Sequence, residues 1–208
     1  MKLMPRDYVI LSQIGRFKCV LGRHIKELAG FGTIRACDRR IKILMDNKYI
    51  HREKVFYGFP YVYSLTHKGK MLLGLNKRKE KIRPEQMKHD GVVVDVVISL
   101  MKESNLKLEK IVSEKEMNMA SGFTVRKHRP DFIINDKDGK IAVEVELSLK
   151  SLKRLQMITK DNFLTYKGQI WYIERKNAKL AHILSEQQKK YPSFLILYLE
   201  NLRGLDIC

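Results

Sequence analysis

Residues 128–150, which read HRPDFIINDKDGKIAVEVELSLK, decide the fold of this chain. Residues 128–135 form an extended run, and residues 141–148 alternate apolar with polar residues, as strands do. The segment 136–140 between them is rich in Asp and Gly, which favour turns. The stretch therefore predicts a β-hairpin.

Three carboxylates gather on one face of this predicted hairpin. Side chains alternate along a strand, so Glu144 and Glu146 share a face while valines alternate with them on the other. If the apolar residues of both strands share one core face, Asp131 lies opposite Glu146 and Ile133 lies opposite Glu144. Like charges so close repel one another unless a cation neutralises them.

A divalent metal would supply that cation. Mg²⁺ and Mn²⁺ prefer carboxylate and water ligands, and Lys150, four residues after Glu146, could orient or polarise a water there. This is the minimum apparatus for hydrolysis of a phosphodiester. The alternative is a solvated strand face whose glutamates pair with Lys150, Lys153 or Arg154.

The segments around the hairpin predict a mixed sheet flanked by helices, in the α+β or α/β class. Residues 89–104 form an apolar stretch of helix length. Strand-like runs follow around 107–116 and 123–135. After the hairpin, the pattern predicts a helix over 148–164, a strand over 169–174, a helix over 177–190 and a strand over 193–199.

The N-terminal part has a different pattern, typical of a winged helix-turn-helix. Short amphipathic helices are predicted over 7–17 and 21–29, followed by the turn 30–33, a helix over 34–47, and strand-like runs over 49–57 and 61–66. The polar, charge-dense segment 76–88 contains a proline and predicts a linker. We therefore expect a DNA-binding domain over 1–75, a basic linker over 76–88 and a second domain, which contains the acidic hairpin, over 89–208.

The predicted helix over 34–47 has a cationic side. At 100° per residue, Arg35, Arg39 and Lys42 lie opposite the apolar residues Ile34, Cys37, Ile41, Leu44 and Met45. Arginine can fork onto guanine in the major groove, and both residue types neutralise phosphates. A solvated charged face is the alternative. The remaining candidate DNA contacts are Arg40, Arg52 and Lys54, with Lys68 and Lys70 nearby.

The predicted hairpin of this first module is rich in aromatic residues. Tyr57, Phe59, Tyr61 and Tyr63 could stack on bases, but aromatic residues in strands more often pack against a neighbouring helix. We favour packing.

The charge of the chain indicates a polyanionic partner. The 208 residues include 41 Lys and Arg against 23 Asp and Glu, for a net charge of +18. Residues 1–75 alone hold 15 basic and 5 acidic side chains. Nucleic acid is the expected partner, and because we find no RNA-binding sheet motif or GXXG loop, DNA is favoured over RNA.

The cysteines and the apolar segments indicate the cellular compartment in which this chain is expected. The three cysteines are far apart and match neither a disulfide framework nor zinc-ligand spacing, which favours a reducing cytoplasm. No signal peptide or membrane-spanning run is recognisable, so no membrane partner is expected.

The acidic stretch resembles the active-site signature of the PD-(D/E)xK nuclease superfamily, whose fold is that of restriction endonucleases. The resemblance rests on Pro130-Asp131, on Glu144-Val145-Glu146 and on Lys150. One residue departs from the pattern, because Glu146 stands where the superfamily usually has lysine. Lys150 is the nearest replacement, ahead of Lys153. Members of the superfamily that keep the fold without cutting are also known.

Over roughly residues 6–200 the chain is similar to the replication-relaxation family of plasmids and integrative elements, and to the MobC-type relaxases. The similarity is carried by HD…VVVDVV from residue 89, SEKEM from residue 113, RPDFII from residue 129 and VEVELSLKS from residue 143. It implies that Asp131, Glu144, Glu146 and Lys150 are catalytic and that Glu114 joins the three acids as a metal ligand. His89 aligns with a histidine of the family, although a capping or packing role is at least as well supported.

The resemblance implies a function in DNA processing. We expect a bacterial mobile-element protein that recognises an origin-like site in double-stranded DNA and nicks or cleaves it with Mg²⁺ or Mn²⁺. A second copy of the chain, or other transfer or replication proteins, are expected partners. The alternative is a non-enzymatic accessory factor or transcriptional regulator, in which the nuclease-like domain serves dimerisation.

Two further sequence features bear on a relaxase mechanism. No two histidines are separated by a single residue, which excludes the usual histidine-triad relaxase. Tyr166, in a polar turn, is a weak candidate for a covalent nucleophile. Tyr172 lies in the apolar run QIWYIE and is expected in the core.

Overall fold

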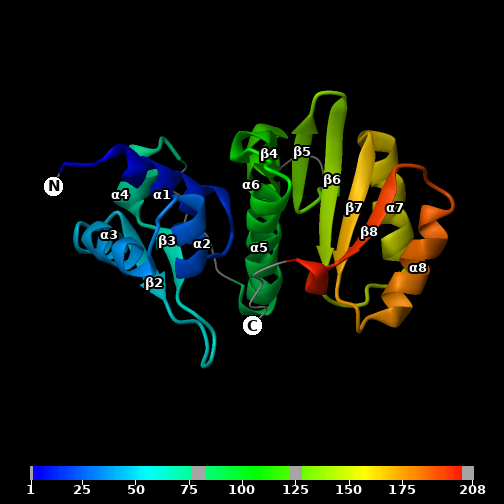
Figure 1. Ribbon diagram of the computed structural model, residues 1–208, viewed down its shortest axis with the longest axis horizontal. Helices are drawn as coiled ribbons and strands as arrows, with labels where there is room; N and C mark the ends of the chain where they lie inside the picture. The colour runs from blue at the N-terminus through cyan, green and yellow to red at the C-terminus, as the bar shows by residue number, and fades with distance from the viewer. Residues whose placement is uncertain (1, 76–82, 122–127, 203–208) are drawn as a thin grey trace. The chain divides into compact units, whose positions relative to one another are not determined.

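The computed structural model describes residues 2–75, 83–121 and 128–202 (Figure 1). The chain has a mixed α/β fold, and the described residues form eight α-helices and two sheets. It divides into two compact units, Met1–Ile98 and Ser99–Asp206. Residues 76–82, most of the expected linker, lie outside the described residues, so the domain boundary placed there stays a prediction.

Three helices open the first unit, as predicted. They are α1 (Pro5–Arg16), α2 (Gly22–Leu28) and α3 (Ile34–Asp46). Gly30 takes a positive φ of 64° in the turn before α3, a conformation that glycine adopts without strain. Thr33 then caps α3, because its side chain accepts a hydrogen bond from the backbone N–H of Ala36 at 3.2 Å.

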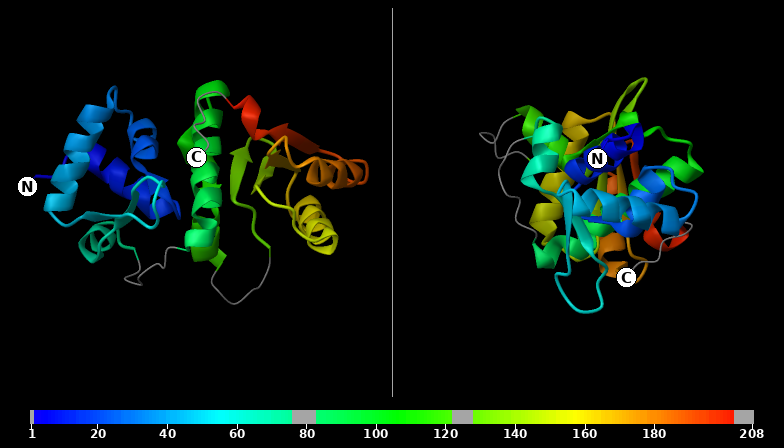
Figure 2. Two further views of the ribbon diagram at one scale, coloured as in Figure 1. Left: turned by 90° about the horizontal axis from the view of Figure 1, so that it is seen from below. Right: turned by 90° about the vertical axis from the view of Figure 1, so that its left-hand side faces the viewer.

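A small antiparallel sheet completes the first unit. Its strand order is β1-β3-β2, with β1 (Val20–Leu21), β2 (Ile50–Glu53) and β3 (Val62–Leu65). β2 and β3 form the predicted hairpin with shorter strands, and the loop that joins them extends away from the helices of the unit (Figure 2). The short helix α4 (His67–Leu72) follows.

A buried ionic cluster links α2 to the helix α5 (Met87–Glu103). His24 is fully buried, and its Nε2 lies 3.0 Å from Asp95 Oδ1. Its Nδ1 accepts a hydrogen bond from the backbone N–H of Leu21 at 3.1 Å, so Nε2 carries the proton. Arg23 forks onto the same Asp95 carboxylate at 3.1 and 2.7 Å. The cluster thus fixes a neutral imidazole inside the unit.

This imidazole makes stability depend on pH. Burial lowers the pKa of His24 and outweighs the opposing effect of Asp95. The unfolded chain, with a histidine pKa near 6.5, then binds the proton more readily than the folded chain. The free energy of unfolding is therefore expected to be highest above about pH 6.5 and to fall as the pH drops towards the folded pKa.

Urea unfolding at pH 7.5 and pH 5.5 measures this dependence. His24→Gln should reduce the loss of stability between the two pH values, because the titrating group is gone. His182→Gln, at an exposed position of the second unit, is the matched control and should leave the wild-type loss unchanged. Equal losses in all three proteins would contradict the assignment.

The second unit is built on a five-stranded mixed sheet in the order β4-β5-β6-β7-β8. The first three strands are antiparallel, and β6, β7 and β8 are parallel. The strands are β4 (Ile111–Ser113), β5 (Phe132–Asp136), β6 (Gly139–Glu146), β7 (Gly168–Ile173) and β8 (Phe194–Tyr198). The predicted hairpin is β5–β6. The strand-like run 107–116 yields only three strand residues, because helix α6 (Glu114–Ser121) begins there.

Two helices cover one face of this sheet, α7 (Leu152–Thr165) and α8 (Ala178–Gln188) (Figure 1). They connect the parallel strands, as parallel pairing requires. Leu155 of α7 and Leu180 of α8 pack with Trp171, whose ring stacks on Phe194 with centroids 6.1 Å apart. This apolar layer fixes α7 against β6 and β7, and with it one side of the acidic site.

Short 3₁₀ turns complete the secondary structure at Pro84–Gln86, Leu108–Lys110 and Leu199–Asn201. None of the helices in the described ranges has the length and apolar character needed to cross a membrane.

Candidate active site and candidate nucleic-acid interface

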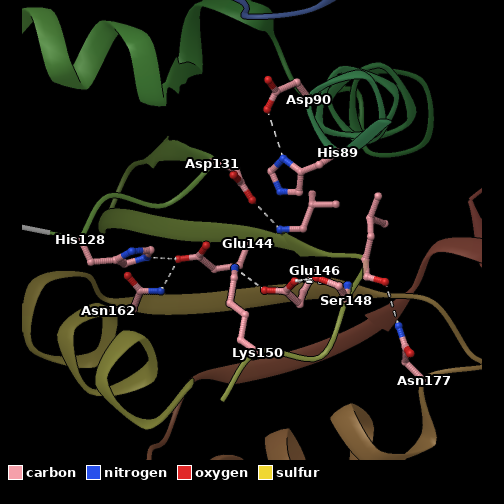
Figure 3. A network of polar contacts seen from close by, with 12 residues as sticks. His89, Asp90, His128, Asp131, Glu144, Glu146, Ser148, Lys150, Asn162 and Asn177 are labelled. Carbon is pink, nitrogen blue, oxygen red and sulfur yellow. Dashed lines mark hydrogen bonds and ion pairs between the residues drawn. The ribbon is translucent and has the colours of Figure 1, made fainter. Parts of the chain in front are cut away.

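The acidic residues meet where β5 begins and β6 ends (Figure 3). β5 and β6 pair from Phe132↔Val143 to Asp136↔Gly139, so the strands run up to a tight two-residue turn. The predicted register assumed a longer turn and is wrong by two residues, although the division into two faces is correct. Asp131, one residue before the paired segment, consequently stands beside Glu144 and not opposite Glu146. Its Oδ2 accepts a hydrogen bond from the backbone N–H of Val145 at 2.7 Å.

Glu144 is a buried acid with partners from two other elements. Its side chain points to the sheet face that α7 covers, and the residue is only 4% exposed. His128 Nε2 lies 2.6 Å from Glu144 Oε1, and Asn162 of α7 donates to the same oxygen at 2.8 Å (Figure 3). Two partners from different elements therefore hold one carboxylate oxygen.

The surroundings of Glu144 and His128 raise the pKa of both side chains. The pKa of Glu144 is raised, first by burial and also by the charge of Asp131, against the opposing effect of His128. Burial lowers the pKa of His128, but the hydrogen bond and charge of Glu144 outweigh it and the net shift is upward. Both shifts favour the protonated forms, so the pair retains a proton more readily than the free side chains would. Such a pair can give and take protons.

Glu146 lies two residues further on the same strand face and is also buried, at 3% exposed. Lys150 forms an ion pair with its Oε2, and Ser148 donates to its Oε1 from both the backbone N–H and the hydroxyl, each at 3.3 Å. The alternative of a solvated strand face predicted that a glutamate would pair with Lys150, and this pairing is observed. Both glutamates are buried, however, so the face is not solvated. Lys153 and Arg154 are exposed on the first turn of α7.

Glu114 adjoins the site through its backbone. Its N–H donates to the carbonyl oxygen of Asp131 at 2.9 Å, and its side chain accepts a hydrogen bond from Asn118 at 3.5 Å. Ser113 and Glu116 form a capping box that starts α6 at this point, with Ser113 N–H donating to Glu116 Oε2 at 2.8 Å. The SEKE segment is therefore a helix start placed against Asp131, the residue that precedes the hairpin.

These side chains do not form a ready metal site. Across residues 2–75, 83–121 and 128–202, no group of three or more His, Cys, Asp or Glu side chains is arranged to hold an ion. Each of the three acids already has an oxygen bound by another protein group. Asp131 accepts a hydrogen bond from the backbone N–H of Val145. Glu144 contacts His128 and Asn162, and Glu146 pairs with Lys150. As arranged, the residues do not fit the predicted Mg²⁺ or Mn²⁺.

Sequence reasoning gave no role to His128 or Asn162. A signal for Asn162 was present, because it continues the inward stripe of α7 formed by Leu155, Ile158 and Thr159 at helical spacing. A polar residue on such a stripe needs a buried partner. The signal for His128 is weaker, since its contact with Glu144 depends on the path of the chain before β5.

The two candidate tyrosines lie in different surroundings. Tyr166 ends α7 and is half-buried, with its hydroxyl 4.0 Å from the sulfur of Met117. Burial raises the pKa of Tyr166, and the charge of Glu144 adds to the shift, so the environment disfavours a phenolate. Tyr172 is buried in β7 as predicted, and burial raises its pKa to about 12.

Helix α3 presents the predicted cationic side. Arg35, Arg39 and Lys42 are exposed, whereas Cys37, Ile41 and Leu44 are buried on the opposite side. Ile34 was expected on the buried side but is 45% exposed, because it is the first residue after the cap, where α3 has not yet reached the core.

The remaining predicted cations lie in different places. Arg40 ion-pairs with the buried carboxylate of Asp7 in α1, so the structure uses its guanidinium inside the unit. Arg52 and Lys54 are exposed at the hairpin, as is Lys68 in α4. Lys70, also in α4, is buried.

Comparison with known proteins adds one match. The family model described as Replication-relaxation matches residues 11–161, which extend over both units and include the acidic residues of β6. Searches of curated proteins and of solved structures found no match to this chain.

Proposed function

This chain belongs to the replication-relaxation family, and from that membership we propose that it binds an origin-like site in the double-stranded DNA of a bacterial mobile element and nicks it there. A role in the replication or transfer of plasmids and similar elements follows from the family. Strand cleavage and the site that performs it are our proposal.

The first unit supports recognition of a duplex. Three helices followed by a β-hairpin are the element order expected of a winged helix-turn-helix, in which the third helix enters the major groove. Arg35, Arg39 and Lys42 stand together on the exposed side of that helix. They are the cations that would fork onto guanine and neutralise phosphates.

The second unit supports cleavage. Its mixed sheet with flanking helices is the layout that the resemblance to the PD-(D/E)xK superfamily implies, and Asp131 precedes β5 while Glu144 lies on β6. The observation that carries the proposal is the burial of two glutamates at the end of the central strand β6, each held by a cation or a proton donor. Buried and perturbed carboxylates cluster at functional sites.

These residues can divide the work of hydrolysis among them. The pair of Glu144 and His128 takes the proton from an attacking water and returns one to the leaving oxygen. Lys150 places a positive charge beside the transferring phosphate, where negative charge builds up in the transition state. Asn162 fixes the orientation of Glu144.

A nicking assay on supercoiled plasmid that carries the element's own origin region tests the proposal. Wild type should produce open-circular DNA, and reactions without added metal, with Mg²⁺ and with Mn²⁺ test the predicted metal at the same time. Glu144→Gln keeps the shape of the side chain but removes its charge, and should lower cleavage at least about 100-fold while DNA binding persists.

Glu186→Gln is the matched control, because Glu186 is a glutamate of α8 that lies outside the acidic site and has a half-exposed side chain. It should cut as wild type does. Equal cleavage by wild type and Glu144→Gln would contradict the assignment of the site.

The second candidate is a non-enzymatic DNA-binding accessory factor. One observation favours it: the strand acids are engaged by protein groups and do not gather as metal ligands within the described residues. Tight and specific binding by wild type without cleavage in any of the three reactions would select this candidate.

A further inference from the structure

The loop between β2 and β3 presents aromatic side chains to solvent. Tyr57 at its tip is 98% exposed, and Phe56 and Tyr61 are 44% and 41% exposed. The expectation that the hairpin aromatics pack inward holds for Phe59 and Tyr63, which are buried, and fails for Tyr57 and Tyr61. An aromatic side chain so completely exposed contributes nothing to packing.

The tip is held in a defined conformation. Phe59 N–H donates to the carbonyl oxygen of Phe56 at 3.4 Å, which closes a four-residue turn, and Gly58 takes the positive φ of 79° that a type II turn requires at this position. Phe59 packs into a core cluster with Cys19 and other apolar residues, and its ring lies 4.9 Å from that of Phe56. The turn therefore presents Tyr57 from an anchored base.

Cations surround the exposed rings. The guanidinium of Arg52 lies 4.5 Å from the ring centre of Tyr61. The ammonium of Lys54 lies 5.6 Å from the ring of Tyr61 and 6.0 Å from that of Tyr57. Flat apolar faces next to positive charges match the two parts of a single nucleic-acid strand, its bases and its phosphates.

We propose that this aromatic tip, Tyr57 and Tyr61 with Arg52 and Lys54, binds unpaired DNA bases by stacking, beside the duplex that α3 contacts. The inference rests on the proposed function, because it assumes that the first unit binds DNA. Bases within a duplex already stack on one another and offer no free face, so an exposed ring gains most from bases that are out of the helix. An origin at which strands are opened or nicked supplies such bases.

Other occupants are less suited to the tip. An apolar protein surface would offer Arg52 and Lys54 no negative partners. Residues 1–75 as a whole hold 15 basic and 5 acidic side chains, which favours a negatively charged partner. A DNA strand satisfies rings and cations together.

Fluorescence anisotropy with two DNAs tests the proposal. One is a duplex of the element's own origin region, and the other is the same duplex with a bubble of unpaired bases. Wild type should bind the bubble more tightly. Tyr57→Ala should weaken binding to the bubble by roughly 5- to 150-fold, the range for loss of stacking on one base, and leave binding to the duplex nearly unchanged.

Matched variants separate stacking from other effects. Tyr57→Phe keeps the ring and should bind as wild type does, whereas Tyr57→Leu keeps apolar bulk without a flat face and should behave as Tyr57→Ala. Tyr8→Ala removes a tyrosine of α1 that is 45% exposed and should change neither affinity. A fluorescent base analogue in the bubble should be quenched by wild type, Tyr57→Phe and Tyr8→Ala, and should not be quenched by Tyr57→Ala or Tyr57→Leu.

The outcomes distinguish this inference from the function on which it rests. Equal binding of both DNAs by wild type and Tyr57→Ala would overturn the inference and leave duplex recognition standing. An equal loss on both DNAs would assign the tip to the duplex and likewise overturn it. Failure of wild type to bind either DNA would overturn the proposed function itself.

Discussion

Replacing Asp7 with alanine is expected to lower the free energy of unfolding of the first unit by about 3 kcal/mol. Asp7 is fully buried in α1, where its carboxylate receives the fork of Arg40 and a hydrogen bond from the backbone N–H of Met4 at 2.7 Å. Its loss leaves a guanidinium without its partner. Broken buried pairs cost about 3–5 kcal/mol, and the lower end applies because the side chain of Arg40 is 19% exposed and retains some water.

Chemical denaturation monitored by circular dichroism measures this loss. Asp38→Ala, which removes an exposed aspartate of α3, is the control and should stay within about 0.5 kcal/mol of wild type. Asp7→Leu combined with Arg40→Met removes both charges and should recover much of the stability. If Asp7→Ala matched Asp38→Ala, the ion pair would have no structural role.

The same pair predicts an acid-sensitive fold. Burial opposes ionisation of Asp7, but the hydrogen bonds from Arg40 and Met4 outweigh it, so the pKa of Asp7 is lowered. Its contribution to stability is then complete above the ordinary carboxyl pKa, near 3.8, and disappears as the pH falls through the folded pKa.

Replacing Lys150 with methionine is expected to lower the rate of DNA nicking by about 10²- to 10³-fold. Lys150 brings a positive charge to the buried end of β6, where its side chain is 26% exposed and pairs with Glu146. In the proposed reaction this charge stabilises the phosphate in the transition state. Methionine keeps most of the length of the side chain and removes the charge.

Lys153→Met is the matched control, since Lys153 is exposed three residues further along and was the second candidate for the same role. Supercoiled-plasmid nicking at several enzyme concentrations gives the rates. Lys150→Arg restores a positive charge and should recover part of the activity, which would show that the loss in Lys150→Met is not merely unfolding around Glu146. Loss of activity in Lys153→Met with retention in Lys150→Met would reverse the assignment.

Much of the fold follows from local patterns. Helices α1 to α3, the hairpin β5–β6 and the alternation of helices and strands after it lie close to their predicted bounds, because each has a clear apolar period, whereas the short helix α4 was not predicted. The sequence did not predict β1, because a strand of two residues is too short to show an alternation of apolar and polar side chains. The register of the hairpin was wrong because side-chain alternation fixes which residues share a face but leaves the offset to the turn, and the observed turn is tighter than assumed.

The site was predictable only in part. Residues close in sequence, such as Glu146 and Lys150, could be paired from their spacing alone. His128 and Asn162 reach Glu144 from a loop and from another helix, so their contacts depend on packing between elements. Arg40 illustrates the converse case, because its partner Asp7 is distant in sequence and no local pattern separates it from the exposed cations of α3.

The buried thiols of the first unit make its opening measurable. Cys37 faces the core from α3 and Cys19 precedes β1, and burial raises their pKa to about 11 and about 12. Only a thiolate attacks an alkylating reagent, so both sulfurs are inert while the unit is closed. Modification at each, followed by peptide mapping, therefore records how often that part of the unit opens. Equal rates mean that the unit opens as a whole, and a faster rate at Cys37 means that α3 detaches by itself.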